Sequence, residues 1–350
     1  MIHRRETKKI QVGNIGVGGD SPITVQSMTN TITADIPATV AQIHSLEAAG
    51  CDIIRCAIND EEDAVAIREI KRQIRIPLIA DIQFDHRLGL YAVENGCDCL
   101  RINPGNIGSK EQVIQVVERC KEYRVPIRIG VNSGSIHREI LQKYGGVNTD
   151  SLVESALQEI RTLEELDFYD IKISIKSSNV VTMIEVYQKI SELVNYPLHL
   201  GVTEAGPARS GSVKSSIGIG TLLYMGIGDT IRVSLTTDPV EEIRIGREIL
   251  RSLGLLKEGV DLISCPTCSR TKVNLIDLIQ RAEERLATVD KNLSVAIMGC
   301  PVNGPGEAKE ADLGIACTNG YGVLFKKGKV IRQVEEQQLL EAMMEELDRM

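Results

Sequence analysis

Three cysteines near the end of the chain have the spacing and surroundings of metal ligands. Cys265-Pro-Thr-Cys268 places two thiols on one tight loop, from which both can reach the same metal ion or cluster. Cys300 follows an apolar stretch, residues 294–298, and precedes a Pro/Gly-rich loop at 301–307. Backbone N–H groups of such a loop can stabilise the negative charge of cluster sulfides. The pattern therefore favours an iron–sulfur cluster bound by Cys265, Cys268 and Cys300.

Two other interpretations of these cysteines stay open. A C-x-x-C pair that follows a strand also occurs in thiol–disulfide redox sites. Structural zinc sites usually combine two such pairs or add histidine, and residues 260–350 contain no histidine. Cys317 follows another predicted strand in the same region, and the pattern alone favours it as a fourth ligand. The other cysteines lie within strand or helix patterns and are expected to be buried apolar residues: Cys51, Cys56, Cys97, Cys99 and Cys120.

Basic side chains recur at one parity of several apolar stretches, as in residues 127–131 (IRIGV) and 171–176 (IKISIK). Alternate side chains of a strand face opposite sides, and the apolar parity belongs under covering helices. The other parity then points inward, and it carries Arg55, Arg101, Arg128, Lys172, Lys176 and Arg232. The carboxylates expected to oppose them are Asp81 and Glu204. Because buried charge is costly unless it is paired, this set predicts an anionic ligand, although single arginines could serve structural ion pairs.

Two weaker signals accompany the basic residues. His86 follows the third predicted strand and is expected on the same face, as an acid or a ligand contact; a solvated loop histidine is the alternative. Residues 215–220 (SSIGIG) could begin a helix and cradle a phosphate, or could form a tight loop.

The elements that must position these residues alternate between strand and helix. Apolar runs predict strands at residues 23–27, 53–57, 78–82, 99–102, 127–131, 171–175, 198–202 and 230–235. Amphipathic segments between them, such as 38–49, 112–123 and 152–166, have helical spacing. Eight such units in about 250 residues favour an α/β fold of the TIM (β/α)8 barrel type, with a doubly wound open sheet as the alternative. Residues 10–19 are expected to form a hairpin that covers the barrel floor.

A second, smaller domain is expected after the barrel. Residues 1–254 form the predicted barrel, 254–259 a connector, and 260–350 an α+β domain that would hold the cluster. Its expected elements are strands at 261–264, 294–298 and 313–316, helices at 272–287 and 335–347, and a hairpin at 321–330.

Composition excludes several classes of function. The net charge of −8, the absence of Trp and an aromatic content of 3% argue against a nucleic-acid partner. No apolar run is long enough to span a membrane, and the basic N-terminus lacks the apolar core of a secretory signal. Nine cysteines in such a chain favour reduced thiols or metal ligands over disulfides, so a cytoplasmic protein is expected.

Four stretches together resemble one enzyme family over essentially the whole chain: residues 25–30 (VQSMTN), 100–106 (LRINPGN), 265–270 (CPTCSR) and 299–307 (GCPVNGPGE). The family is 4-hydroxy-3-methylbut-2-enyl diphosphate synthase of the non-mevalonate isoprenoid pathway, in its compact bacterial form. The resemblance implies a TIM barrel joined to a [4Fe–4S] domain. It also implies reductive ring opening and dehydration of 2-C-methyl-D-erythritol 2,4-cyclodiphosphate, with two electrons from reduced flavodoxin or ferredoxin. Family members are head-to-tail homodimers in which the cluster of one chain caps the barrel of the other.

The resemblance also implies roles for individual residues. The diphosphate would be bound by Arg55, Arg101, Arg128, Lys176, Arg232 and Ser234. His86 is a further expected substrate contact from its position after the third predicted strand, and not from the resemblance. Asn132, Glu204 and Asn303 would line the site near the carbon skeleton as catalytic residues. Glu307, rather than Cys317, would be the fourth cluster ligand, because a carboxylate is more easily displaced from iron by a substrate oxygen. The alternative function is a non-catalytic barrel that binds a phosphorylated ligand, joined to a structural zinc module.

Overall fold

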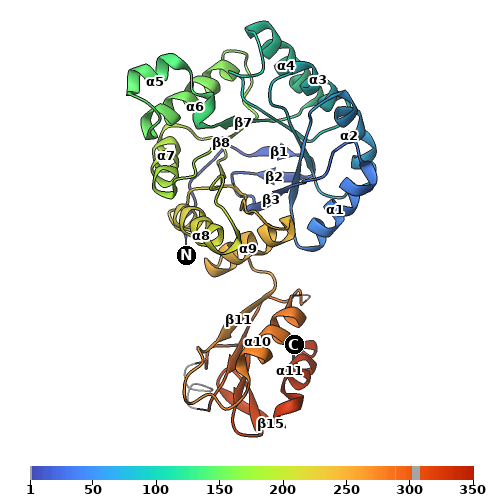
Figure 1. Cartoon of the computed structure of the whole chain (residues 1–350), viewed down its shortest axis with the longest axis vertical. Coiled ribbons are helices and arrows are strands. Elements are labelled where there is room, and N and C mark those ends of the chain that lie inside the picture. The colour runs from blue at the N-terminus through green and yellow to red at the C-terminus, as the bar shows by residue number, and fades with distance from the viewer. Residues whose placement is uncertain (1, 288, 302–307) are drawn as a thin grey trace. The chain divides into compact units, whose positions relative to one another are not determined.

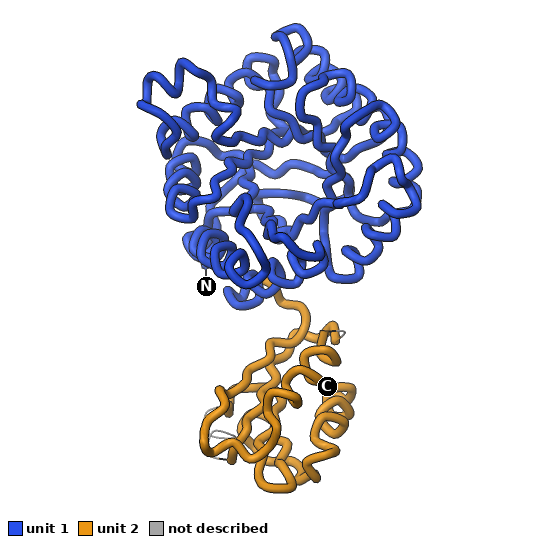
Figure 2. Tube along the Cα trace, in the orientation of Figure 1, with its two compact units in different colours: residues 1–255 blue, residues 256–350 orange. Residues whose placement is uncertain are grey.

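Eight parallel strands form the core of the larger of two compact units, residues 1–255 and 256–350, in the computed structural model (Figures 1 and 2). The structure describes residues 2–287, 289–301 and 308–350, so the predicted site residues Asn303 and Glu307 lie outside the described residues. The strands pair in the order β8-β7-β6-β5-β4-β3-β10-β9, and a parallel bridge from Ile173 in β8 to Leu198, just before β9, closes the ring. The predicted TIM barrel is thus confirmed and the open doubly wound sheet is excluded.

The barrel strands are β3 (Thr24–Met28), β4 (Ile53–Ala57), β5 (Leu78–Asp81), β6 (Cys99–Ile102), β7 (Ile127–Val131), β8 (Ile171–Ile175), β9 (His199–Leu200) and β10 (Thr230–Ile231). The last two are shorter than the sequence predicted. Beyond β10, the backbone N–H of Leu235 donates to the Glu242 side chain, 2.8 Å away, instead of to a neighbouring strand. The Glu242 side chain therefore replaces a neighbouring strand as the hydrogen-bond acceptor where the chain leaves the barrel.

Helices surround the strands, as Figure 1 shows. They are α1 (Ile36–Ala48), α2 (Glu61–Gln73), α3 (His86–Glu94), α4 (Lys110–Tyr123), α5 (Arg138–Tyr144), α6 (Thr149–Glu164), α7 (Val180–Leu193), α8 (Ala208–Tyr224) and α9 (Pro239–Ser252). Several begin at an Asp or Asn whose side chain accepts a hydrogen bond from the first turn, as Asp60 does from Asp63. Both interpretations of residues 215–220, a helix start that cradles a phosphate and a tight loop, are wrong, because α8 begins at Ala208 and these residues lie in its interior.

A hairpin closes the floor of the barrel. Strands β1 (Ile10–Val12) and β2 (Ile15–Val17) pair antiparallel, as predicted. Their apolar side chains pack against Ile53, Ile79 and Cys99, which lie at or near the start of β4, β5 and β6. Apolar packing at this end leaves the opposite, C-terminal end of the barrel to the polar side chains.

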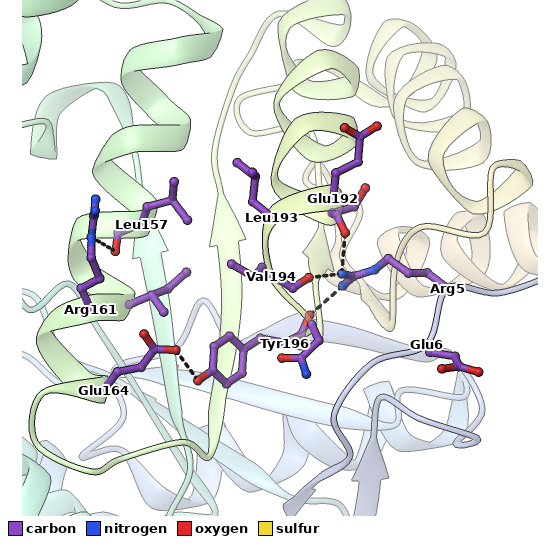
Figure 3. A pocket seen from close by; sticks show the side chains of 12 residues that line it. Arg5, Glu6, Leu157, Arg161, Glu164, Glu192, Leu193, Val194 and Tyr196 are labelled. Atoms are coloured by element: carbon purple, nitrogen blue, oxygen red, sulfur yellow. Dashed lines mark hydrogen bonds between the residues drawn. The ribbon is translucent and has the colours of Figure 1, made fainter.

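The N-terminal segment is also attached outside the barrel, where it meets the end of α7 (Figure 3). Arg5 donates hydrogen bonds to the carbonyl oxygens of Ser191, Val194 and Tyr196, and the Tyr196 hydroxyl donates to Glu164, 2.8 Å away. The bonds from Arg5 to Ser191 and Val194 satisfy carbonyl groups that the end of α7 leaves free. The adjoining cavity, of about 590 Å³, is thus lined by residues that anchor helix ends.

The smaller unit is a five-stranded sheet with two helices. Its strands are β11 (Val260–Ser264), β12 (Leu293–Met298), β13 (Leu313–Cys317), β14 (Tyr321–Lys326) and β15 (Lys329–Glu335), paired in that order. The first three are parallel and the last two antiparallel to their neighbours. Helices α10 (Leu275–Leu286) and α11 (Leu339–Asp348) pack on one face, over a core that includes Val295, Ile315 and Leu324. Within the described part of the chain, no helix combines the length and apolar character that crossing a membrane requires.

Candidate active site

Four cations lie inside the barrel and are almost completely buried: Arg55, Arg101, Arg128 and Lys172, with exposures of 0 to 3%. Arg101, Arg128 and Lys172 are register partners on the adjacent strands β6, β7 and β8, so they lie at one level of the barrel. Each occupies the parity that the sequence assigned to the interior. Neighbouring positive charges at one level repel each other, and the arrangement therefore requires negative charge nearby.

Asp81, at the end of β5, supplies part of that negative charge. Its Oδ1 accepts a hydrogen bond from Arg101 Nη1 at 2.9 Å, and its Oδ2 lies 3.5 Å from Arg55 Nε. Burial alone would raise the pKa of Asp81, but the two arginines outweigh burial and hold the pKa below its usual value. Asp81 is therefore a charged partner of two arginines, as the sequence suggested.

The second opposing carboxylate is Glu242 on α9, which sequence reasoning missed. Glu242 is 5% exposed, its Oε1 accepts from the Leu235 backbone N–H, and its Oε2 lies 3.7 Å from Arg232 Nη2. Glu204, the residue predicted for this task, makes no ion pair with any described residue. The signal that could have revealed Glu242 is its position on the buried face of α9, between Pro239 and Ile243.

Many donors of these cations have no partner among the described residues. They include Arg55 Nη1, Arg128 Nε and Nη1, Arg232 Nε and Lys172 Nζ, all buried. A cavity of about 40 Å³ reaches this group and is lined by Arg55, Arg128, Ser174, Lys176, His199, Gly201, Val202, Thr203, Arg232 and Ser234. Buried N–H groups rarely remain unsatisfied in proteins. The arrangement is therefore suited to an anion with several acceptor oxygens.

A larger cavity of about 540 Å³ adjoins the small one and shares Lys176 and Thr203 with it. Asn132 and Glu204 line this larger cavity. Glu204 has a φ of +52°, in the left-handed region that costs energy for a residue other than Gly. Such strain is common at functional sites. Glu204 lines the larger cavity and does not line the small cavity among the buried arginines.

The two lysines of the site have lowered pKa values. Burial, and then repulsion by Arg101, Arg55 and Arg128, lowers the pKa of Lys176 to about 7. Burial lowers the pKa of Lys172 to about 8. Both shifts mean that the charged ammonium lacks enough neighbouring negative charge, which an anion bound among these groups would supply.

His86 contacts Asp85 and none of the basic residues described above. It is the first residue of α3, its side chain is 15% exposed, and its Nδ1 lies 3.7 Å from Asp85 Oδ1. It lines neither of the two cavities described above. The structure thus places His86 near the C-terminal end of β5 without joining it to the basic residues.

Cysteines of the smaller unit gather at one edge of its sheet. Strands β11 and β12 are parallel neighbours, so Cys265 and Cys300 emerge from the same edge. The Gly299 N–H donates to Cys265 Sγ at 3.2 Å, which ties the two loops together. Cys268 is exposed, and a hydrogen bond from the Arg270 backbone lowers its thiol pKa. Within the described residues no set of three or more ligating side chains is already arranged around a metal position.

Cys317, at the end of β13, lies in the apolar core of the smaller unit. It is fully buried in the core beneath α10 and α11. Burial raises its pKa to about 12, with smaller contributions from Glu336, Cys265 and Cys300. The donor chemistry of the three thiols at the sheet edge, Cys265, Cys268 and Cys300, fits an iron–sulfur cluster.

Comparison with known families covers nearly the whole chain. Residues 7–247 match the GcpE TIM-barrel domain, and residues 261–349 match the GcpE protein C-terminal domain. This chain belongs to the GcpE family.

Curated relatives in the GcpE family share more than half of their residues with this chain. The protein of Clostridium tetani is 61% identical, with 99% of each chain covered, and that of Clostridium perfringens is 60% identical, with 97% of each covered. The protein of Anoxybacillus flavithermus is 53% identical over 100% of this chain and 96% of its own. All three are named 4-hydroxy-3-methylbut-2-en-1-yl diphosphate synthase (flavodoxin).

Solved structures resemble the GcpE-family barrel in fold alone. Dihydropteroate synthase of Yersinia pestis superposes with a TM-score of 0.52 at 10% identity, covering 70% of this chain and 97% of that chain. 3-Dehydroquinate dehydratase of Geobacillus kaustophilus superposes with a TM-score of 0.50 at 15% identity, covering 71% and 99%. The likeness to these solved structures is evidence for the barrel and not for a shared reaction.

Proposed function

We propose that this chain catalyses the reductive ring opening and dehydration of 2-C-methyl-D-erythritol 2,4-cyclodiphosphate to 4-hydroxy-3-methylbut-2-enyl diphosphate. Electrons would come from reduced flavodoxin, the donor in the names of the relatives, or from ferredoxin. The single observation that carries the proposal from the structure is the group of unpaired, buried cationic N–H donors inside the barrel. A cyclic diphosphate offers several acceptor oxygens and negative charge within a small volume.

The diphosphate would be held by Arg55, Arg101, Arg128, Lys176, Arg232 and Ser234. Existing contacts orient these side chains before the substrate arrives. Arg128, for example, donates from Nη2 to Ser174 Oγ at 2.8 Å and keeps Nε and Nη1 free for the ligand. Because the donors are already fixed, little conformational entropy is lost on binding.

The carbon skeleton would occupy the larger cavity, beside Asn132 and Glu204. Loss of water from the substrate requires a proton at the departing hydroxyl oxygen. Glu204 lines that cavity, and its carboxyl group would hold or transfer this proton. Asn303 is proposed to act from the cluster loop, and His86 to contact the substrate from the end of β5.

Cys265, Cys268 and Cys300 would hold a [4Fe–4S] cluster, with Glu307 as a displaceable fourth ligand. When bound, the cluster supplies electrons one at a time and a Lewis-acidic iron for a substrate oxygen. The chain contributes the tight loop that presents Cys265 and Cys268. In that loop, Thr271 donates its backbone N–H to the Cys268 carbonyl and accepts the Cys268 N–H on its hydroxyl.

We further propose that residues 1–254 act as the substrate-binding domain and residues 260–350 as the cluster domain of a cytoplasmic homodimer. The support is the resemblance described above, in which the cluster of one chain serves the barrel of the other. Mixing an Arg128→Ala variant with a Cys300→Ala variant should then restore activity in mixed dimers. If the chains exchange and no activity returns, the shared site is wrong.

An anaerobic assay with the cyclic diphosphate and reduced flavodoxin tests the reaction. Phosphorus NMR should show the two ring phosphorus signals replaced by those of a linear diphosphate. A matched Cys300→Ala protein, which keeps the barrel, should bind the substrate and leave it unchanged. If the wild-type protein, with its metal sites filled, leaves the cyclic diphosphate intact, the proposed reaction is wrong and the non-catalytic alternative gains.

A further inference from the structure

A buried carboxylate outside the barrel ties down the loop that follows β6. Glu159, in the middle of α6, is 2% exposed, and its Oε2 accepts a hydrogen bond from the Gly105 N–H at 3.0 Å. Gly105 belongs to the segment after Arg101 in the chain. Burial raises the pKa of Glu159 to about 7, so its position is unfavourable for an ionised carboxylate. Burying an apolar residue at this position would cost less free energy, so the carboxylate is expected to have a function.

The same N–H group also holds the side chain of Asn103. Gly105 N–H donates to Asn103 Oδ1 at 3.2 Å, so one donor is shared between the amide and Glu159. Asn103 lies two residues beyond Arg101, on the inward parity, and is 4% exposed. Its Nδ2 is buried and has no partner among the described residues. Because the oxygen of the amide is held by the loop, the two N–H donors of Nδ2 remain for another acceptor.

Packing around Gly105 leaves this arrangement little freedom. A Cβ at Gly105 would lie 2.6 Å from Glu159 Oε1 and 2.8 Å from His137 Nε2. His137 is the residue before α5, in the segment that follows β7 and Asn132. Its Nε2 is 3.8 Å from Glu159 Oε1, which is too far for a hydrogen bond. Glu159 therefore lies between the segments that leave two neighbouring strands of the site.

We propose that Glu159 is a positioning residue for the substrate: it fixes the Gly105 N–H, and through it turns the Asn103 amide so that Nδ2 donates to a substrate oxygen. This inference rests on the proposed function, since the oxygen belongs to the cyclic diphosphate. Glu159 itself does not touch the substrate. The ligand atom that Asn103 recognises must be an acceptor, either a hydroxyl oxygen or a diphosphate oxygen.

The test measures binding of the cyclic diphosphate to the full chain by calorimetry, without reductant, so that no turnover occurs. Glu159→Leu removes the acceptor at similar volume and Asn103→Ala removes the donor. Each should weaken binding about tenfold, the size of one hydrogen bond. Glu159→Gln keeps an acceptor oxygen for Gly105 and should retain wild-type affinity within about threefold. Glu165→Gln, at the exposed end of the same helix, is the matched control and should bind normally.

A double variant separates positioning from a general structural role. If Glu159 acts through Asn103, then Glu159→Leu combined with Asn103→Ala should bind no more weakly than Asn103→Ala alone. Additive losses would overturn the inference, and so would normal binding by Glu159→Leu. If Glu159→Leu fails to fold, Gly105→Ala displaces the same contact, and normal binding by that variant would equally overturn it. A folded wild-type chain that does not bind the cyclic diphosphate would instead overturn the proposed function, and this inference with it.

Discussion

Each arginine of the barrel contacts a neighbouring side chain and has other N–H groups that a ligand could accept. Replacing an arginine with Ala would remove the partner of that neighbour, and the cost to stability differs between positions. Arg101 forms a hydrogen-bonded ion pair with the buried Asp81, so Arg101→Ala would leave that carboxylate with the more distant Arg55 and the neutral amide of Gln83. Breaking a buried pair costs about 3–5 kcal/mol of stability. Arg232 is 20% exposed in its side chain and lies farther from its carboxylate, Glu242. Arg232 is therefore the cleaner position for a binding test.

Arg232→Ala should weaken binding of the cyclic diphosphate by about 10- to 100-fold, because a charge-assisted contact contributes about 1.5–3 kcal/mol. The midpoint of thermal unfolding should change little. Titration calorimetry and differential scanning calorimetry on the same preparation measure both. Arg244→Ala, on the exposed side of the same segment of chain, is the control. Wild-type affinity in Arg232→Ala would show that the cations serve structural pairs and not a ligand.

Lys176 makes binding depend on pH. In the free protein its pKa is lowered to about 7, by burial and then by Arg101, Arg55 and Arg128, with Asp81 opposing them. A bound anion favours the ammonium and raises that pKa, so a proton is taken up on binding. Affinity should then be full below about pH 7 and fall as the pH rises above it. The two acidic groups of a cyclic diphosphate remain ionised throughout, so the ligand adds no titration of its own.

Calorimetry at about pH 6 and about pH 8.5 checks this sign, with weaker binding expected at the higher value. The Lys176→Arg variant keeps its positive charge at both pH values, so its affinity should fall less between the lower and the higher pH than that of the wild type. A smaller dependence should remain in that variant, because the pKa of Lys172 is about 8. Equal wild-type affinity at both pH values would contradict the account of Lys176.

Two variants distinguish the candidates for the fourth cluster ligand, Cys317 and Glu307. Cys317 is fully buried in the apolar core of the smaller unit, so Cys317→Ala, which keeps that position apolar, should keep its iron and most of its activity. Glu307→Ala should lose activity and hold iron less tightly, since its carboxylate is the proposed ligand. Iron analysis and activity after anaerobic purification measure the two. The opposite ranking would make Cys317 the ligand and Glu307 dispensable.

At the residue scale, the sequence predicted the side chains that alternate along strands and missed those that reach the site from helices. Arg101, Arg128 and Lys172 follow from parity alone. Glu242 and Glu159 do not, because each lies on a helix and accepts from a backbone N–H of a loop, 7 residues away for Glu242 and 54 residues away for Glu159. Local periodicity carries no information about such contacts, and a buried carboxylate on an apolar helix face is the only local sign of them.

At the scale of elements, the barrel keeps its chemistry at one end because the other end is filled. The β1–β2 hairpin packs Ile10, Val12 and Val17 against residues at or near the start of three barrel strands. Strand positions and the hairpin were predictable from apolar runs and turn residues. The lengths of β9 and β10 were not, because Leu235 donates to a side chain of α9 instead of to a strand.

Ile10→Ala should lower the free energy of unfolding by about 2–5 kcal/mol, since it removes a side chain that is 2% exposed and leaves a cavity in the floor. Chemical denaturation followed by circular dichroism measures the loss. The folded fraction should bind the cyclic diphosphate normally, because the anion site is at the other end of the barrel. Gln11→Ala, exposed in the same strand, should change stability little. Full stability in Ile10→Ala would mean that the hairpin does not help to hold the barrel together.

At the scale of the whole molecule, the chain divides into two compact units, each with its own core and its own set of chemical groups. Under the proposed function, the barrel would supply the cations that bind the substrate and the smaller unit the thiols that hold the cluster. The division near residue 255 was predictable from the change in strand and helix pattern. The full set of metal ligands was not, because the C-x-x-C spacing brings Cys265 and Cys268 together but does not determine which residues distant in sequence would join them.

The most direct test of the central claim is the metal content of the full chain, purified without oxygen. Iron, acid-labile sulfide and zinc are measured per chain, together with the visible absorption spectrum. The account predicts a brown protein with about four iron and about four sulfide per chain and broad absorption near about 400 nm. A colourless protein that retains zinc and takes up no iron and sulfide on reconstitution would contradict it.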